Sequence, residues 1–125
     1  MREPSWWRPS LGVGVVLCIV LMGGAGAGAA AEPKKFTVIN MLLDGTKIWL
    51  PSSLMVPQGE EVELTLINKL EDPHGFQLEA FGIVEVVPPK AQTVVTFTAS
   101  QPGAYSYLCP LHPPHLGGQI LALSQ

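Results

Sequence analysis

The sequence predicts an all-β domain, built as a Greek-key β-sandwich or barrel. Short segments rich in β-branched and aromatic residues follow one another after residue 35, and turn signals separate them. No segment of useful length has the 3.6-residue periodicity of an amphipathic helix. Ten of the 12 prolines lie in residues 32–125, which disfavours long helices. Short strands at this spacing are typical of a sandwich or a barrel.

The alternation of apolar and polar residues is clearest in EVELTLIN, residues 61–68. Val62, Leu64 and Leu66 fall on one face of this segment and polar residues fall on the other, as in a half-buried strand. The expected strands, in chain order, are 36–42, 47–51, 61–68, 74–81, 83–89, 93–99, 104–109 and 118–123.

Turn signals separate several of these strands. DGT at 44–46 joins the first two, and VPQGE at 56–60 is expected to be a turn because it places proline and glycine before the third. QPG at 101–103 precedes the aromatic segment AYSYLC. The short run EPKK at 32–35 is expected to be a polar lead-in.

Residues 1–31 have the order of a secretory signal peptide. Arg2 and Arg8 precede the apolar run LGVGVVLCIVLMGG, and the small-residue tract AGAGAAA follows it. We therefore expect cleavage after Ala29 or Ala31, which leaves a domain at 32–125 in the periplasm.

Two other fates of this leader stay open. Residues 11–31 are about long enough to cross a bilayer, so the leader could remain as an uncleaved membrane anchor. Lipidation at Cys18 is the second alternative, and it is disfavoured because Leu17 stands where a small residue is usual. The domain is expected at the membrane only if the leader is kept.

The predicted domain is mildly acidic. Residues 32–125 carry nine of the ten acidic residues and five of the seven basic ones. Because no basic stripe is present, nucleic acid is excluded as an expected partner. Cys109 is the one cysteine left after cleavage, so no disulfide can form within the mature chain, and an odd cysteine in an exported protein indicates another role.

One loop, CPLHPPH at 109–115, gathers a thiol and two imidazoles. Cys109, His112 and His115 have the spacing C-x2-H-x2-H, and the third histidine, His74, lies on a different turn. The prolines of the loop exclude a regular helix, so the chain must wrap, which suits ligands that converge on one ion. Taken singly, such a cysteine is most often a small buried hydrophobe. The joint occurrence at ligand spacing predicts a metal site.

The donor types narrow the choice of metal. A thiolate with two or three imidazoles suits copper or zinc, whereas calcium and magnesium prefer oxygen. Structural zinc usually occupies a closed tetrahedral site, often with several cysteines. One thiolate and two imidazoles with a variable fourth ligand are typical of copper electron-transfer sites. We therefore expect one copper ion per chain.

The prolines also limit the hydrogen bonds that the sulfur can accept. Pro110 has no N–H group, so a backbone hydrogen bond to the Cys109 sulfur is expected from Leu111 or Gly75. The prolines of the loop should also restrict the backbone between ligands and reduce the entropy lost when the loop closes on an ion.

Two motifs resemble those of the cupredoxins. One is N-x5-H-G-F, and the other is G-x-Y-x-Y-x-C-x2-H, which is followed by a closing GGQILAL segment. The matching residues are Asn68, His74, Gly103, Tyr105, Cys109 and His112. This resemblance covers about residues 36–125. It implies a Greek-key sandwich of about eight strands with one copper near one end, held by Cys109, His74 and His112.

Position 115 departs from the C-x2-H-x2-M pattern that many members of that family have. Many cupredoxins have a weak axial methionine where this chain has His115. The chain is also similar to the nitrosocyanin-like red copper proteins, in GFQLEAFGIVEVV and in C-x-L-H-P. In that subgroup a carboxylate replaces His74, and the last two histidines are farther apart. Both resemblances imply that His115 is a ligand, either in the axial place or in a shortened red-copper loop.

The expected function is one-electron transfer by a periplasmic copper protein that has redox partner proteins and is not itself an enzyme. The alternatives are a copper redox enzyme with an open coordination position, a copper-handling protein and a zinc-stabilised structural module. No substrate pocket, second metal set or Met-rich tract is visible in the sequence. Four aromatic residues are expected in the core or on a sheet face, without a redox role: Trp49, Phe97, Tyr105 and Tyr107.

Overall fold

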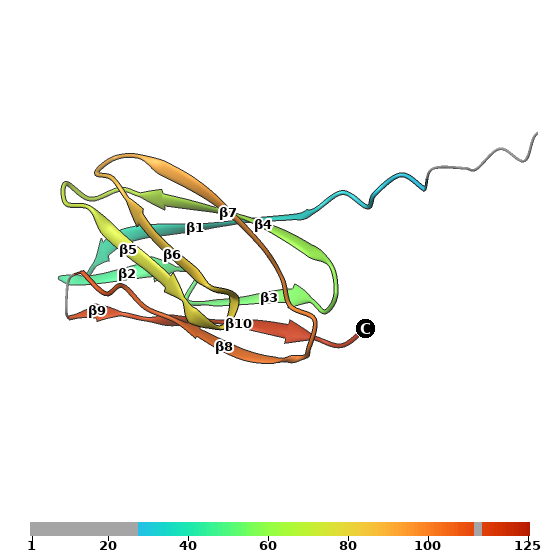
Figure 1. The fold of residues 1–125 in the computed structure, drawn as a ribbon. Helices are drawn as coiled ribbons and strands as arrows, with labels where there is room; N and C mark the ends of the chain where they lie inside the picture. The colour runs from blue at the N-terminus through green and yellow to red at the C-terminus, as the bar shows by residue number, and fades with distance from the viewer. Residues whose placement is uncertain (1–27, 112–113) are drawn as a thin grey trace, which may run out of the picture.

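Ten strands and one 3-10 helix make up the computed structural model, which describes residues 28–111 and 114–125 (Figure 1). The strands are β1 (Lys34–Leu43), β2 (Thr46–Leu50), β3 (Ser53–Pro57), β4 (Glu61–Asn68), β5 (His74–Leu78), β6 (Ile83–Val87), β7 (Gln92–Thr98), β8 (Gly103–Tyr107), β9 (His115–Leu116) and β10 (Gly118–Leu123). The 3-10 helix η1 spans Glu79–Phe81. Within the described residues, no helix has the length and hydropathy of a membrane span. Most of the predicted signal peptide lies in residues 1–27, outside the described part, and stays a prediction.

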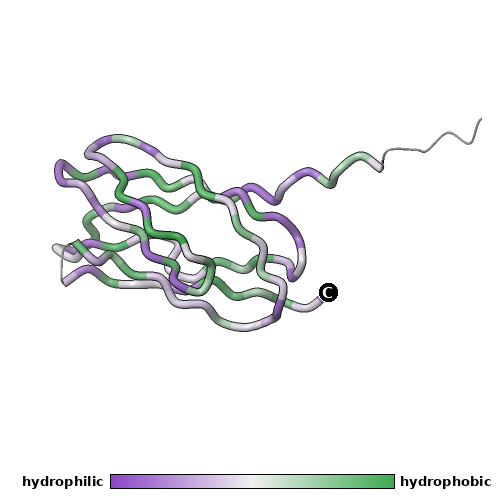
Figure 2. The backbone as a smooth tube through the Cα atoms, in the orientation of Figure 1, coloured by the Kyte–Doolittle hydropathy of each residue, from purple (hydrophilic) through white to green (hydrophobic). Residues whose placement is uncertain are grey.

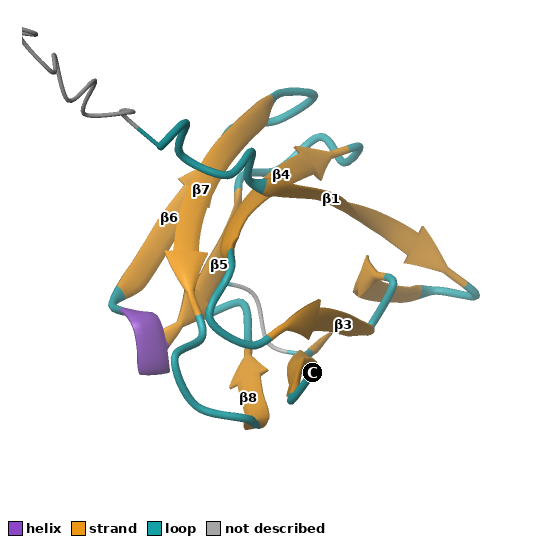
Figure 3. Cartoon of the chain, turned by 90° about the vertical axis from the view of Figure 1, so that its right-hand side faces the viewer, coloured by secondary structure: helices purple, strands orange, loops and turns teal. Residues whose placement is uncertain are grey.

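The strands form two layers. The first layer is a five-stranded sheet with the order β7-β4-β1-β2-β9, and the second contains the three-stranded sheet β3-β10-β8. The β5-β6 hairpin extends the second layer, because the backbones of Gln77 and Leu108 exchange hydrogen bonds of 2.8 and 3.1 Å. Figure 3 shows β1 and β4 on one side of the interior and β3 and β8 on the other. The predicted all-β sandwich is confirmed.

The inner faces of the layers share one apolar core. On β4, Val62, Leu64 and Leu66 are fully buried and the residues between them are not, as the alternation predicted. The largest fully buried side chains include Trp49, Tyr107, Phe76, Leu64, Leu66, Leu78, Ile120 and His74. Figure 2 shows hydrophobic residues recurring along the strands.

The aromatic residues lie where the sequence placed them. Trp49, Tyr107 and Phe97 are buried, and Tyr105 is partly buried against the same core. Two of their ring pairs tie β8 to its neighbours. Phe76 lies 4.7 Å from Tyr107 between ring centroids, and Phe81 of η1 lies 4.7 Å from Tyr105. Such contacts add to the free energy of burial.

Two of the expected boundaries are wrong. The segment 56–60 was expected to be a turn, but its first two residues end β3, which pairs with β10 and buries Leu54 and Val56 in the core. Prolines close to both ends of this short strand hid its alternation. The strand expected at 74–81 stops at Leu78, because the chain turns through η1 into Gly82, whose φ of 66° favours glycine.

Candidate metal centre

Three strand ends meet at the end of the sandwich that lies away from the N-terminal lead-in and the C-terminus (Figure 1). β5 begins with His74, β8 ends just before Leu108 and Cys109, and β9 begins with His115. The first two elements belong to one layer of the sandwich and β9 belongs to the other. The topology therefore brings together three side chains from separate parts of the sequence.

Asn68 organises the loop that leads to His74. This residue ends β4 and is fully buried, and its Nδ2 donates hydrogen bonds to the carbonyl oxygens of Asp72 at 2.7 Å and Pro88 at 3.2 Å. Its Oδ1 accepts a hydrogen bond from the amide of Leu70 at 3.0 Å. A buried side chain thus replaces the strand hydrogen bonds that the loop lacks. The loop delivers His74, itself fully buried, to the first position of β5.

The thiol of Cys109 is buried, and it forms no disulfide within the described part of the chain. Its Sγ accepts a hydrogen bond from the backbone amide of Gly75 at 3.2 Å. Gly75 was one of the two donors expected, since Pro110 has no N–H group to offer. Hydrogen bonds to a metal-binding sulfur tune the reduction potential of the metal that it binds.

Gly75 has no room for a side chain. A Cβ at this position would lie 2.6 Å from Cδ of Pro110 and 3.1 Å from its Cγ. The proline ring therefore packs directly on the Gly75 backbone. Gly75 follows His74 and Pro110 follows Cys109. Their contact therefore holds the segment of His74 against the segment of Cys109.

Trp49 forms a wall of the site from β2. Its Nε1 donates a hydrogen bond to the carbonyl oxygen of Gly75 at 3.2 Å, and its ring centroid lies 6.4 Å from that of His115. The indole is fully buried and meets Phe76 edge to face at 5.6 Å. Gly75 is thus held on both sides, by Trp49 at its carbonyl and by Cys109 at its amide.

His115 is placed by β9, a two-residue strand that pairs in parallel with β2. This strand lies in a segment expected to be an irregular loop, and two residues are too few to show a periodicity. The His115 Nε2 lies 3.0 Å from Oδ1 of Asn40, and its Nδ1 lies 3.0 Å from the carbonyl oxygen of Leu116. Asn40 is fully buried on β1.

The side chains of His74, Cys109 and His115 are close enough to hold one metal ion. One ligand atom from each lies within 4.8 Å of the others, and His74 Nδ1 lies 3.8 Å from Cys109 Sγ. Typical metal–sulfur and metal–nitrogen bonds imply donor separations of about 3.6 Å in a tetrahedral site and about 3.8 Å in a trigonal plane. The arrangement therefore fits an ion that accepts thiolate and imidazole, namely copper or zinc.

The structure brings together three of the four expected ligands. His112, the fourth, lies outside the described residues, so its role stays a prediction. Asn40 was not among the expected site residues, and Trp49 was expected only in the core. A signal for Asn40 was present, because it is the polar residue on the inward face of the first strand, two positions after Val38.

A sandwich that gathers a buried cysteine and histidines at one end defines a class of small metal-binding β proteins. Residues 14–122 match the family of cupredoxin-like domains, and the chain belongs to this family. Copper is therefore the metal that both the donor set and the family favour.

Relatives with known functions or structures agree with this assignment. Nitrous-oxide reductase from Stutzerimonas stutzeri is 30% identical in an alignment of 82 residues that covers 55% of this chain and 13% of that protein. The copper nitrite reductase of Nitrosomonas europaea superposes with a TM-score of 0.63 at 21% identity, over 75% of this chain and 42% of that chain. The metal-binding domain of the Cu(I)-exporting P-type ATPase of Streptococcus pneumoniae gives a TM-score of 0.55 at 17% identity, over 70% and 96%. This chain thus spans only a part of both reductases.

Proposed function

We propose that this protein is an exported mononuclear copper protein that carries single electrons between partner proteins. The observation that carries the proposal is the buried thiol of Cys109, which lies 3.8 Å from Nδ1 of His74 at a separation suited to one bound ion. A bound copper would supply the one-electron chemistry by alternating between Cu(II) and Cu(I).

The residues around the ligands hold the geometry fixed. Gly75 donates its amide hydrogen to the sulfur, and Trp49 and Pro110 hold Gly75 in place. Side chains that are locked in this way change little between oxidation states of a bound ion. Small reorganisation is what an electron carrier requires.

The proposed ligand set is His74, Cys109, His112 and His115. The cupredoxin resemblance supports the first three as strong ligands, and the closeness of His115 to His74 and Cys109 supports the fourth. An imidazole in place of an axial thioether gives stronger nitrogen donation and favours a tetragonal site. Such a site would be spectroscopically nearer to the red copper proteins than to a blue one.

The surface near the site suits brief contact with redox partners. Leu108 and Leu111 flank Cys109 in sequence, Leu116 follows His115, and their side chains are 48%, 44% and 54% exposed. Exposed apolar side chains grouped near a site favour docking without a strong charge requirement. The leader of the chain supports export to the periplasm as part of this proposal.

Catalysis at copper is a second candidate function. It is favoured by the red-copper resemblance and by the similarity to parts of two proteins that are named as reductases. An open coordination position distinguishes the two functions, because a carrier does not need one. Tight binding of azide or nitric oxide to the Cu(II) form would put catalysis ahead of electron transfer.

The first test is metal identity. The mature protein loaded with Cu(II) should hold one copper per chain and show an intense thiolate-to-copper band in the visible spectrum. Cys109→Ser should remove the band and leave the sandwich folded by circular dichroism, because the apolar core does not include the sulfur. Tight zinc binding together with weak, colourless Cu(II) binding would contradict the proposal.

A further inference from the structure

We propose that Asn40 is a positioning residue of the metal centre. Its Oδ1 accepts a hydrogen bond from Nε2 of His115 and leaves Nδ1 of that ring to bind the metal. The inference rests on the proposed function, since it takes His115 as a ligand.

The contacts of the Asn40 side chain indicate one role for it, a hydrogen bond to His115. The residue lies on the inner face of β1, opposite Trp49 of β2, and it is fully buried. Its Oδ1 lies 3.0 Å from Nε2 of His115, whereas its Nδ2 has no hydrogen-bond partner among the residues that the structure describes. A buried amide with one end unbonded is destabilising, so an Asn at this position needs a compensating role.

Asn68 provides the contrast. It is the register partner of Asn40 on the neighbouring strand β4 and is equally buried. Both ends of its amide are bonded to the backbone, where they fix the loop before His74. Its hydrogen bonds to this loop therefore explain why a buried Asn occupies position 68. No backbone group of the described chain uses the side chain of Asn40 in this way, and its contact is with His115.

Metal binding through Nδ1 of His115 would break a different contact from metal binding through Nε2. Nδ1 lies beside the carbonyl oxygen of Leu116 in an exposed contact, and Nε2 lies beside Asn40 in a partly buried one. If Nδ1 turns to the metal, the Leu116 carbonyl can accept a hydrogen bond from water instead. If Nε2 did so, the fully buried amide of Asn40 would lose its hydrogen bond. Metal binding through Nδ1 therefore costs less free energy than metal binding through Nε2.

The resulting arrangement is one that metal sites commonly use. A ligating histidine usually donates its other ring N–H to an oxygen, which fixes the tautomer and the ring orientation. His74 also presents its Nδ1 to the site, at 3.8 Å from Cys109 Sγ. Loss of such an outer partner typically lowers metal affinity about 10- to 100-fold. We expect a loss of this size in Asn40→Val.

The test identifies directly which ring nitrogen of His115 carries the proton. The protein labelled with 15N-histidine is loaded with Cu(I), which is diamagnetic, and the long-range 1H–15N spectrum is recorded. The signals of His115 are assigned by their absence in His115→Gln. We expect a slowly exchanging proton on Nε2 and none on Nδ1. Asn40→Val should lose the exchange protection and bind Cu(I) more weakly, measured by competition with a chelator.

Two further variants separate this role from general packing. Asn40→Asp keeps an oxygen that can accept the hydrogen bond, so the proton on Nε2 of His115 should remain. If Asn40 acted instead as a donor through its Nδ2, the Asp variant would lose that role. Val38→Ala, which truncates a fully buried residue on the same face of β1, should lower stability but leave the His115 signals unchanged.

The outcomes are distinct. A proton on Nδ1 in the loaded wild type, or an unchanged spectrum and affinity in Asn40→Val, would overturn the role of Asn40. A wild type that binds no copper would instead overturn the proposed function.

Discussion

Gly75 joins the His74 and Cys109 segments of the candidate metal centre through its backbone alone. Its amide donates to the sulfur of Cys109, its carbonyl accepts from Trp49, and the ring of Pro110 covers the place of a side chain. The need for glycine here is therefore steric rather than conformational. One methyl group at this position should disturb the sulfur without touching a ligand.

Gly75→Ala is expected to lower the reduction potential of the copper form. The added Cβ must push Pro110 aside and lengthen the amide-to-sulfur hydrogen bond, which removes stabilisation from the electron-rich reduced site. We expect a fall on the order of tens of mV, where 59 mV corresponds to a tenfold change for one electron. Voltammetry measures it. Pro110→Ala in the same chain removes the colliding atoms and should restore most of the potential, so a double variant no better than Gly75→Ala would contradict the steric explanation.

His115→Met tests whether position 115 supplies a ligand. A thioether donates more weakly to Cu(II) than an imidazole, so the variant should move the absorption toward that of a blue site. Its reduction potential should rise on the order of 100 mV, which is roughly a 50-fold shift toward Cu(I). His74→Ala should instead weaken copper retention strongly. If the wild type is already blue and the Met variant changes neither quantity, His115 is not a ligand.

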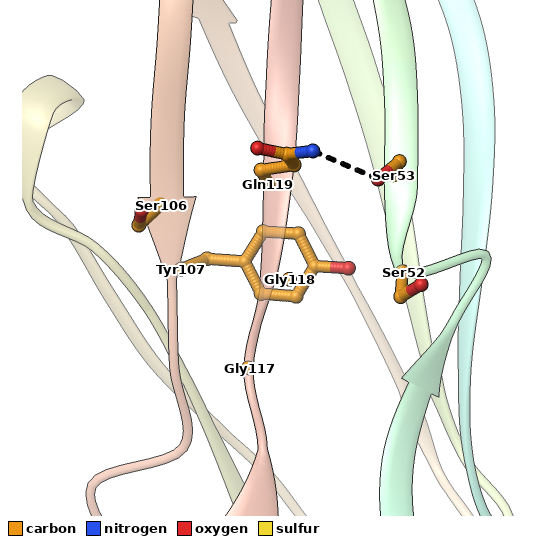
Figure 4. A pocket seen from close by; sticks show the side chains of 7 residues that line it. All are labelled: Ser52, Ser53, Ser106, Tyr107, Gly117, Gly118 and Gln119. Atoms are coloured by element: carbon orange, nitrogen blue, oxygen red, sulfur yellow. Dashed lines mark hydrogen bonds between the residues drawn. The ribbon is translucent and has the colours of Figure 1, made fainter.

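Strand β10 is held against its neighbours by close packing at its first residues. The ring of Tyr107 on β8 lies across Gly118, as Figure 4 shows, and a Cβ on Gly118 would collide with the Tyr107 hydroxyl. That hydroxyl donates a hydrogen bond to the carbonyl oxygen of Pro51 at 3.1 Å. The open polar depression at this place, lined by serines and Gln119, is therefore part of how β3, β10 and β8 fit together.

Tyr107 should make the stability of the fold sensitive to alkaline pH. Burial raises the pKa of its hydroxyl from 10.0 to about 12. The neutral form is thus favoured in the folded state, so the stabilisation is complete below pH 10 and is lost as the pH rises toward 12. Urea unfolding at a series of pH values should show this loss, with a slope of up to about 1.4 kcal/mol per pH unit.

Tyr107→Phe isolates the contribution of the hydroxyl. The variant loses the hydrogen bond to Pro51, which should cost about 1 kcal/mol at neutral pH, and it should also lose the alkaline dependence. Tyr105→Phe, which removes a hydroxyl bonded in an exposed contact to Gln101, is the matched control and should change stability less. If the free energy of unfolding of Tyr107→Phe still falls at alkaline pH, the pH dependence comes from another group.

At the scale of the whole molecule, the sequence predicted what depends on local patterns. Alternation identified the inner face of β4, and the Cys/His spacing pointed to Cys109 and His115, which the structure brings near His74 in a group that could hold a metal ion. What it could not predict depends on contacts across the fold. β9 is a strand only because β2 lies beside it, and Asn40 reaches His115 across 75 positions of sequence. Such contacts leave no periodic signal.

The distribution of the core predicts that the fold does not need its metal. The buried apolar cluster extends over both layers, whereas the Cys/His cluster lies at one end. A structural zinc module unfolds when a chelator removes the ion, because its core is too small to fold alone. This chain should instead keep its β-sheet circular dichroism and unfold cooperatively after copper removal. Adding copper at about 100 times its Kd should stabilise the folded state by about 2.7 kcal/mol, seen as a higher Tm. Loss of the sheet signal on chelation would assign the centre a structural role and remove the main argument against zinc.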